Sequence, residues 1–325
     1  MFVVLQSGLV AAHRASDGGE LWHVDLRSDH GVVIEGSRVF VGAAGGIHAL
    51  DVETGAEAWH SPSAALTAPL LVRNGWIVAA TAAGLSAFRS ADGTEVWSRE
   101  TGAQHVRATI EGDNLYVPLD DGRLLALDLR TGADRWKRHF AGPLSEVLAL
   151  PDRVFAGSAD KYFYALNAET GADAWRSRLG VSLQGAPIAD ATRVFAAGMD
   201  NVIRAYDRGS GALRWHTSVP FRPTGVVLVG SSILVPGMSA ELHAFGASSG
   251  KAEGKITLDQ KLVAAPGLGT LETVVVMAAV TGSLTGDWKL IFAMEPPKPP
   301  PSIDLVPLIV MPGTTVPVAT PGPPG

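Results

Sequence analysis

The segment ALDLRTGADRW, from Ala126 to Trp136, decides the fold because it recurs along most of the chain. A close copy, ALDVETGAEAW, runs from Ala49 to Trp59, and both fit the pattern A-x-D-x-x-T-G-x-x-x-W. The tryptophan of the pattern occurs six times, at Trp22, Trp59, Trp97, Trp136, Trp175 and Trp215. Successive copies are 37, 38, 39, 39 and 40 residues apart. A period near 40 residues indicates a solenoid or a propeller.

Two further residue types recur at fixed distances from the tryptophans, and we call each recurring position a column. A glycine stands four residues before each one, at Gly18, Gly55, Gly93, Gly132, Gly171 and Gly211. An alanine stands ten residues before each one, at Ala12, Ala49, Ala87, Ala126, Ala165 and Ala205. A seventh unit keeps Ala244 and Gly250 but has Gly254 in the place of the tryptophan. Each period therefore encodes one structural unit.

The apolar runs within each unit distinguish between the two architectures. Runs of four to six residues rich in Val, Ile, Leu and Phe, such as VFVGA at 39–43 and VFAGS at 154–158, are bounded by Asp-Gly, Thr-Gly and Asn-Gly. Such runs predict strands joined by tight turns. Four strands per period make one propeller blade, whereas a helical solenoid would need long segments with a 3.6-residue period.

We therefore predict an all-β, eight-bladed propeller of four-stranded antiparallel blades, with strands labelled A to D from the axis outward. The first unit begins at strand B, because residues 2–6 align with 39–43. The eighth unit supplies strands A, B and C near 262–268, 274–280 and 289–294. The propeller then occupies residues 1–295.

The remaining residues, 296–325, hold eleven of the 21 prolines. Because proline cannot donate to a β-ladder, one interpretation is a polyproline II or disordered linker. The alternative is that residues 303–311 cross the seam and supply the missing strand A of the first blade, which would cover an unpaired edge.

Each position of the pattern has a physical role. Alanine leaves room beside a bulky neighbour, and the Asp or Asn of the C–D turn accepts hydrogen bonds from backbone N–H groups ahead of it. Glycine accepts positive φ and exposes a flat backbone face, on which we expect the indole of the neighbouring unit to lie. Burying one indole contributes at most about 4–6 kcal/mol.

The repeated pattern resembles the tryptophan-docking motif of the PQQ-like, or quinoprotein-type, β-propeller repeats, over residues 1–294. That family includes quinoprotein dehydrogenases and smaller non-enzymatic propellers, notably the eight-bladed BamB-type scaffolds of outer-membrane protein assembly. The length of this chain is similar to that of the scaffold branch. The resemblance implies a binding scaffold of the cell envelope with a protein or peptide partner and an extracytoplasmic location.

Some features depart from both branches. The chain has no cysteine, so it lacks the vicinal cysteine pair typical of the dehydrogenases and the lipobox cysteine typical of BamB-type lipoproteins. Its N-terminus has no basic segment before the apolar stretch, so we do not identify a signal peptide there. One alternative, raised by the missing first strand, is that this start is internal and that an export signal lies upstream.

Composition and motifs exclude several other functions. The formal net charge of −6 argues against nucleic acid as a partner, and no apolar run is long enough for a transmembrane helix. The sequence contains no nucleophile elbow, no phosphate-binding loop and no H-E-x-x-H. His23, His60 and His216 follow repeat tryptophans and are interpreted as solvated, and the acidic B–C turns carry too few oxygens for calcium. We therefore expect no catalytic residue, no metal and no cofactor.

The segments that cross from strand D to the next strand A differ from unit to unit, unlike the three columns. Divergent polar residues at one rim are typical of a recognition surface, although unconstrained loops also vary. The candidate binding residues are His30, Gln104, His105, Arg107, Ser145, Glu146, Gln184, Arg222 and Thr224. Among these, Arg107 and Arg222 are candidates for holding an anion.

The sequence thus predicts a non-catalytic propeller that binds protein or peptide through one face. The first alternative is a sensor that binds PQQ or another small ligand. The second is a PQQ-dependent dehydrogenase.

Overall fold

The computed structural model describes residues 2–257, except positions 5, 6, 15, 16, 18, 29, 44 and 240, together with 288–291 and 309–312. All regular elements in this part of the chain are strands, as the sequence predicts, and all of them pair antiparallel.

The strands form consecutive sheets in chain order. Six sheets have four strands, the first sheet has three, and the last described sheet has two. The first three sheets comprise β1 (Phe2–Val4), β2 (Leu9–His13), β3 (Glu20–Asp25); β4 (Val32–Glu35), β5 (Arg38–Ala43), β6 (Gly46–Asp51), β7 (Glu57–Pro62); and β8 (Leu71–Arg73), β9 (Trp76–Ala80), β10 (Gly84–Arg89), β11 (Glu95–Glu100).

The next three comprise β12 (Thr109–Glu111), β13 (Asn114–Pro118), β14 (Arg123–Asp128), β15 (Asp134–His139); β16 (Leu148–Ala149), β17 (Arg153–Gly157), β18 (Tyr162–Asn167), β19 (Asp173–Arg178); and β20 (Ile188–Ala189), β21 (Arg193–Ala197), β22 (Val202–Asp207), β23 (Leu213–Ser218). The last two comprise β24 (Val227–Val229), β25 (Ser232–Val235), β26 (Glu241–Gly246), β27 (Ala252–Thr257); and β28 (Trp288–Ile291) with β29 (Ile309–Pro312).

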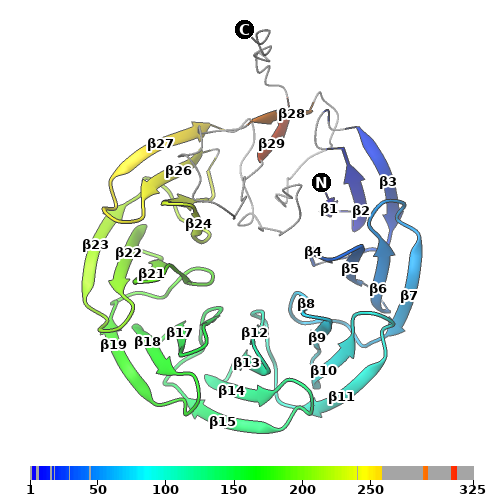
Figure 1. The fold of residues 1–325 in the computed structure, drawn as a ribbon, viewed down its shortest axis with the longest axis horizontal. Coiled ribbons are helices and arrows are strands. Elements are labelled where there is room, and N and C mark those ends of the chain that lie inside the picture. The colour runs from blue at the N-terminus through cyan, green and yellow to red at the C-terminus, as the bar shows by residue number, and fades with distance from the viewer. Residues whose placement is uncertain are drawn as a thin grey trace, which may run out of the picture.

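The sheets stand around a common centre like the blades of a propeller, with the first strand of each inside and the last outside (Figure 1). The strands β28 and β29 lie between the seventh sheet and the first (Figure 1). The first sheet begins at strand B, as predicted, because β1, β2 and β3 correspond to β5, β6 and β7.

Two details of the sequence prediction are not settled by the described residues. Eight blades remain a prediction, because 258–287 and 292–308 lie outside the described part. The boundary at 295/296 and most of the proposed closing segment, 303–311, also lie outside it. Within the described residues, β29 pairs with β28, with Lys289 opposite Met311.

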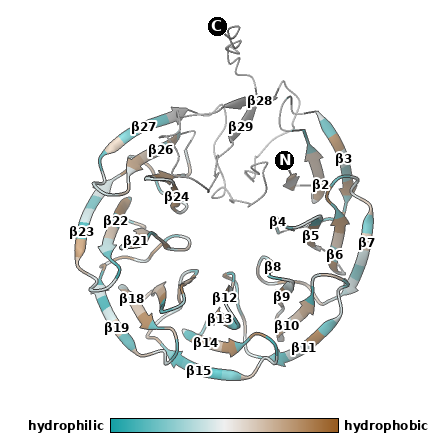
Figure 2. Ribbon diagram, viewed as in Figure 1, coloured by the Kyte–Doolittle hydropathy of each residue, from teal (hydrophilic) through white to brown (hydrophobic). Residues whose placement is uncertain are grey.

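The core lies between neighbouring sheets. The B and C strands are buried almost throughout, whereas the D strands alternate and expose most of their side chains. Figure 2 shows the same gradient, with hydrophilic colours concentrated along the outermost strands. One cluster joins Tyr116 and Ala126 of the fourth sheet to Val154 and Tyr164 of the fifth. Because each sheet from the second to the sixth packs its faces against two neighbours, the loops at its two ends stand on a packed support.

Candidate functional site

Each repeat glycine from the second unit to the seventh lies under the indole of the preceding unit. A Cβ added to one of these glycines would lie 2.5–2.9 Å from ring atoms. The pairs are Trp22 with Gly55, Trp59 with Gly93, Trp97 with Gly132, Trp136 with Gly171, Trp175 with Gly211 and Trp215 with Gly250. We call these pairs the docking column. All six glycines have φ between 65° and 74°, which a side chain would strain. Gly18 lies outside the described residues.

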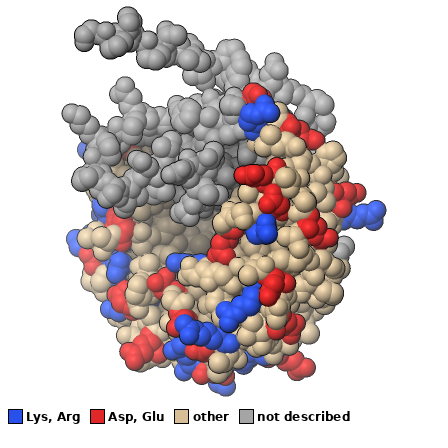
Figure 3. Space-filling view, turned by 45° about the vertical axis from the view of Figure 1, so that its right-hand side comes forward, with Lys and Arg blue, Asp and Glu red and all other residues tan. Residues whose placement is uncertain are grey.

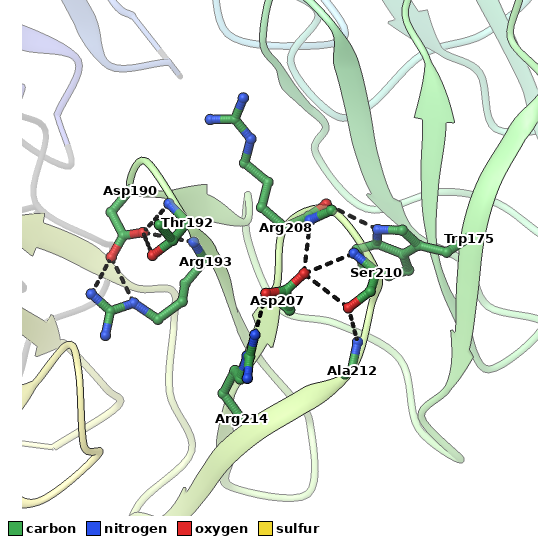
Figure 4. Close-up of polar contacts among 10 residues, drawn as sticks. Trp175, Asp190, Thr192, Arg193, Asp207, Arg208, Ser210, Ala212 and Arg214 are labelled. Atoms are coloured by element: carbon green, nitrogen blue, oxygen red, sulfur yellow. Dashed lines mark hydrogen bonds and ion pairs between the residues drawn. The ribbon is translucent and has the colours of Figure 1, made fainter.

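The indole N–H groups of the docking column also have a constant partner. Each Nε1 donates to the carbonyl oxygen three residues before the contacted glycine, at distances of 2.8–3.2 Å. Trp175, for example, donates to Arg208 O (Figure 4). The sequence pattern indicated the glycine but not this acceptor. A half-buried indole therefore keeps its one polar group satisfied.

The alanine column has a direct structural reason. Every repeat alanine with a tryptophan in its unit is the cross-strand partner of that tryptophan, as Ala126 is of Trp136. The register between strands C and D shifts immediately after the alanine, as between Ala126 and Leu127. In the seventh sheet Ala244 pairs with Gly254, and nothing lies within 4 Å of a Cβ added there.

The C–D turns use the acidic residue as the sequence predicts. Asp207 Oδ1 accepts hydrogen bonds from Ser210 N and Ser210 Oγ, both at 2.8 Å, while Oδ2 accepts one from Arg214 (Figure 4). These bonds, that from Arg214 first, hold the pKa of the Asp207 carboxyl well below its usual 3.8. The side-chain hydrogen bond from Thr54 likewise lowers the pKa of Asp51.

The D strands form what we call the outer wall of the ring. Charged side chains on this wall connect two pairs of neighbouring sheets. Arg99 reaches from the third sheet to Asp134 of the fourth at 2.9 Å, and Arg138 reaches from the fourth to Asp173 of the fifth at 2.7 Å. Both guanidinium groups also donate to the carbonyl oxygen of a repeat glycine. Elsewhere on the wall, basic and acidic side chains are interspersed (Figure 3). Neither ion pair was predicted from the sequence.

The D–A segments, which we call crossings and number from one to six along the chain, meet the B–C turns at one end of the ring. Together they form what we call the crossing face. It comprises the described residues of 26–31, 63–70, 101–108, 140–147, 179–187 and 219–226, with the turns 81–83, 119–122, 158–161, 198–201 and 236–239. Backbone hydrogen bonds join the two sets, as from Asp120 N to Ala103 O and from Met199 N to Ser182 O. Strand bridges such as Leu183 with Gly198 continue these links. The divergent residues therefore stand on an ordered backbone.

Four of the candidate binding residues help to hold the crossing face together. His30 Nε2 donates to Leu66 O of the next crossing at 3.3 Å. Ser145 Oγ accepts from Gly157 N at 3.2 Å, and its backbone N–H donates to Gly157 O. The N–H groups of Gln184 and Thr224 donate to Ala197 O and Pro236 O. The Thr224 hydroxyl is buried without a hydrogen-bond partner in the described chain.

The third crossing places its candidates in opposite environments. Gln104 is 2% exposed, and its amide donates to Val106 O at 2.6 Å, so this side chain serves the loop itself. His105 is exposed and pairs with the Asp120 carboxylate of the adjoining turn. Arg107 is exposed, and no ion pair to it is found within the described residues.

The remaining charged candidates are spread around the ring. Arg222 is exposed and Glu146 is half-buried, each without an ion-pair partner among the described residues. Arg107 and Arg222 belong to the third and sixth crossings, with two other crossings between them. A single small anion bound by both is therefore not supported by their place in the fold.

Two features of the crossing face escaped the sequence analysis. Met199 and Met238 occupy the same position of neighbouring B–C turns and are 42% and 62% exposed. Lys161 and Asn201 have positive φ, 75° and 61°, in the equivalent turns of the fifth and sixth sheets. A non-glycine residue in this conformation costs about 1–2 kcal/mol. They stand where the fourth sheet has Gly122, whose φ of 84° is also positive; the recurrence of these turns is visible in the sequence, but the positive φ is not.

Neither a metal centre nor a membrane span is found in the described part. No group of three or more His, Asp or Glu side chains that could hold a metal ion occurs among the residues described. Within the same residues no helix is long and apolar enough to cross a membrane. His23, His60 and His216 are exposed, in agreement with their interpretation as solvated wall residues.

Comparison with known proteins gives one family match over most of the chain. The model of the family described as "Outer membrane protein assembly factor BamB" matches residues 6–147, 142–226 and 199–286. A curated relative of the same description from Shewanella oneidensis is 30% identical over 167 residues, which cover 43% of this chain. That match spans only 41% of the relative's length.

Solved structures give the same architecture. BamB from Moraxella catarrhalis aligns with a TM-score of 0.72 at 21% identity, covering 86% of this chain and 88% of that chain. The computationally designed protein Ika8 aligns with a TM-score of 0.69 at 14% identity, covering 85% and 96%. A quinohemoprotein alcohol dehydrogenase from Pseudomonas putida HK5 aligns at 0.63 and 15% identity, covering 85% and 68%. At these identities the likeness establishes the fold alone.

Proposed function

This chain belongs to the family described as outer membrane protein assembly factor BamB, and we propose that it is a non-catalytic propeller scaffold of outer-membrane protein assembly. Its crossing face binds a protein or peptide partner. The observation that carries this proposal is the contrast between a wall that repeats the same contacts and a crossing face that changes from sheet to sheet on an equally ordered backbone.

The physical argument is preorganisation. The crossings are fixed by backbone hydrogen bonds and isolated bridges to the B–C turns, so little ordering entropy is lost when a partner binds. The exposed His105, Arg107 and Arg222 provide polar contacts without a change of backbone. We therefore infer that this surface serves binding.

Site-specific photo-crosslinking tests which face binds. A photoreactive amino acid replaces Arg107, Glu146 or Arg222 on the crossing face, or Lys137 or Leu213 on the outer wall. In cells of the source organism, we expect crosslinks to a component of the outer-membrane assembly machinery from the crossing-face positions only. Crosslinks from the wall alone, or none from any position, would contradict the proposal.

The non-catalytic assignment has its own test. PQQ and calcium are added to the purified chain, and both visible absorbance and dye reduction are followed. We expect neither a bound chromophore nor turnover. Binding without turnover would favour a sensor instead, and turnover would favour a dehydrogenase.

We also propose that the docking column sets the angle between blades and that the complete ring has eight of them. Residues 303–311 would then close the first blade. Deleting residues 303–325 should lower the melting temperature. An unchanged melting temperature would leave closure to another segment.

A further inference from the structure

The crossing face carries one pair of exposed apolar side chains that its architecture does not require. Met199 and Met238 stand at the same position of the B–C turns of the sixth and seventh sheets, where the fourth and fifth sheets have Asp120 and Ala159. Three other large apolar side chains are exposed in the described chain, and all three, Leu21, Val96 and Leu213, lie on D strands of the wall.

One crossing, 219–226, connects the two methionine turns. Its first residue, Val219, donates its N–H to Asn201 O at 2.8 Å, within the turn of Met199. Arg222 O then accepts from Met238 N at 3.0 Å in the neighbouring turn. Phe221 lies against the backbone of Gly237, where an added Cβ would collide with its ring. The two methionines and Arg222 are therefore held on one continuous, fixed stretch of surface.

The charges of this stretch are unbalanced. The carboxylates of its turns are already neutralised, because Asp200 pairs with Arg204 and Glu241 pairs with Lys255 and His243. These bonds, led by those from Arg204 and Lys255, lower the pKa of both carboxyls. The exposed guanidinium of Arg222 has no ion pair among the described residues. The unmatched charge is therefore positive.

We propose that Met199, Met238 and Arg222 form a docking surface for a protein segment that combines apolar side chains with carboxylates. This inference rests on the proposed binding function of the crossing face and names the chemistry of the partner. Thioether side chains adapt to differently shaped apolar groups, and arginine forms bidentate pairs with carboxylates. The alternative occupant is an anionic lipid surface, which the Arg222 guanidinium would also attract.

Defined peptides test the partner chemistry. The probe is a fluorescein-labelled peptide that alternates Leu or Phe with Glu, and fluorescence anisotropy measures its binding to the full chain. Two matched peptides replace every Glu by Lys or every apolar residue by Ser. Vesicles containing phosphatidylglycerol test the lipid alternative by co-sedimentation. We expect the acidic apolar peptide to bind at least about tenfold more tightly than either matched peptide, a difference of roughly 1.4 kcal/mol.

Variants then locate the binding. The double variant Met199→Ser/Met238→Ser and the single variant Arg222→Glu should each weaken the peptide about tenfold or more, as expected of central contacts. The matched wall variants Leu213→Ser and Lys137→Glu should bind like the wild type. Equal binding of the acidic and basic peptides, an equal loss in the wall variants, or binding to vesicles alone would overturn the inference.

The crosslinking experiment separates this inference from the function beneath it. If positions 107 and 146 capture an assembly component but the acidic apolar peptide does not bind, the docking surface is wrong and the scaffold function stands. If no crossing-face position captures a partner, the scaffold function itself fails.

Discussion

The outer wall and the crossing face are built from the same repeat, yet they differ in which features recur from unit to unit. On the wall, all six described joints place an indole over a glycine at nearly constant geometry. On the crossing face, the equivalent backbone hydrogen bonds recur, from Ser145, Gln184 and Thr224, but the side chains that they carry do not. One region repeats both backbone and side chain, and the other repeats only the backbone.

This difference indicates where stability and recognition reside. The repeat tryptophans of the wall are constrained because each indole contacts the next unit, so a change in one joint disturbs two sheets. On the crossing face, Arg222 is exposed without an ion pair among the described residues and His105 pairs with the adjoining turn, so we expect such side chains to change at low cost. Four predictions test this division, from the largest expected effect to the smallest.

Removing one docked indole should lower the stability of the fold more than any other change considered. In Trp136→Ala the ring leaves Gly171 uncovered and the Ala168 carbonyl loses a donor that lies 2.9 Å away. We expect the free energy of unfolding to fall by about 3–5 kcal/mol, measured by urea denaturation. The adjacent exposed Lys137→Ala should change it by no more than about 0.5 kcal/mol. Similar losses of unfolding free energy in the two variants would show that a docked indole contributes no more than an exposed side chain of the wall.

Adding one methyl group beneath an indole should lower the free energy of unfolding by a smaller amount. Gly171 and Gly180 have φ of 70° and 78°, but only at Gly171 would a Cβ meet Trp136, at 2.7 Å. Gly180→Ala should lose about 1–2 kcal/mol from the backbone alone, and Gly171→Ala about 2–4 kcal/mol. The difference between the two measures the indole contact, and equal losses would show that the ring simply moves aside.

The acidic turns should make stability depend on pH. The folded pKa of Asp207 lies below 3.8, so its hydrogen bonds stabilise the fold above that pH, and this contribution is lost as the pH falls through the lower folded value. In thermal melts from pH 7 to pH 2, Asp207→Asn should start lower and then fall less steeply than the wild type below about pH 4. Parallel curves would contradict the prediction.

Relieving strain on the crossing face should have the smallest effect and the opposite sign. Lys161 has a φ of 75°, and among the described residues its ammonium group bonds only to Ser182. Lys161→Gly should raise the free energy of unfolding by up to about 1 kcal/mol. The control Lys161→Ala keeps the strained backbone and should not gain stability. A loss in the glycine variant would mean that the lysine side chain itself stabilises the turn.

The fold could be predicted from the sequence because its determinants are local and repeated. Ala126, Gly132 and Trp136 keep fixed spacings, so the strand order, the C–D turn and the place of the indole follow from one unit and apply to the others. Gly250 was identified in the same way even though its unit has no tryptophan.

The candidate site could be predicted only as a region. The variation of the crossings indicated one end of the ring, whose role as a binding face stays a prediction. A linear pattern does not tell that Gln104 turns inward or that Asp120 lies beside His105. Met199 and Met238 also escaped notice, because each sits alone in its stretch of sequence and becomes one of a pair only when neighbouring sheets are set side by side.

Each repeat indole contacts the next unit along the chain, and this direction has a consequence for the ancestry of the chain. Each copy from the second to the sixth carries a glycine that receives the indole of the copy before it and a tryptophan that contacts the copy after it. An unequal recombination event that inserts one whole period therefore delivers a module already compatible with both neighbours. Growth of such a gene requires no simultaneous change elsewhere, which accounts for a chain made of so many near-identical lengths.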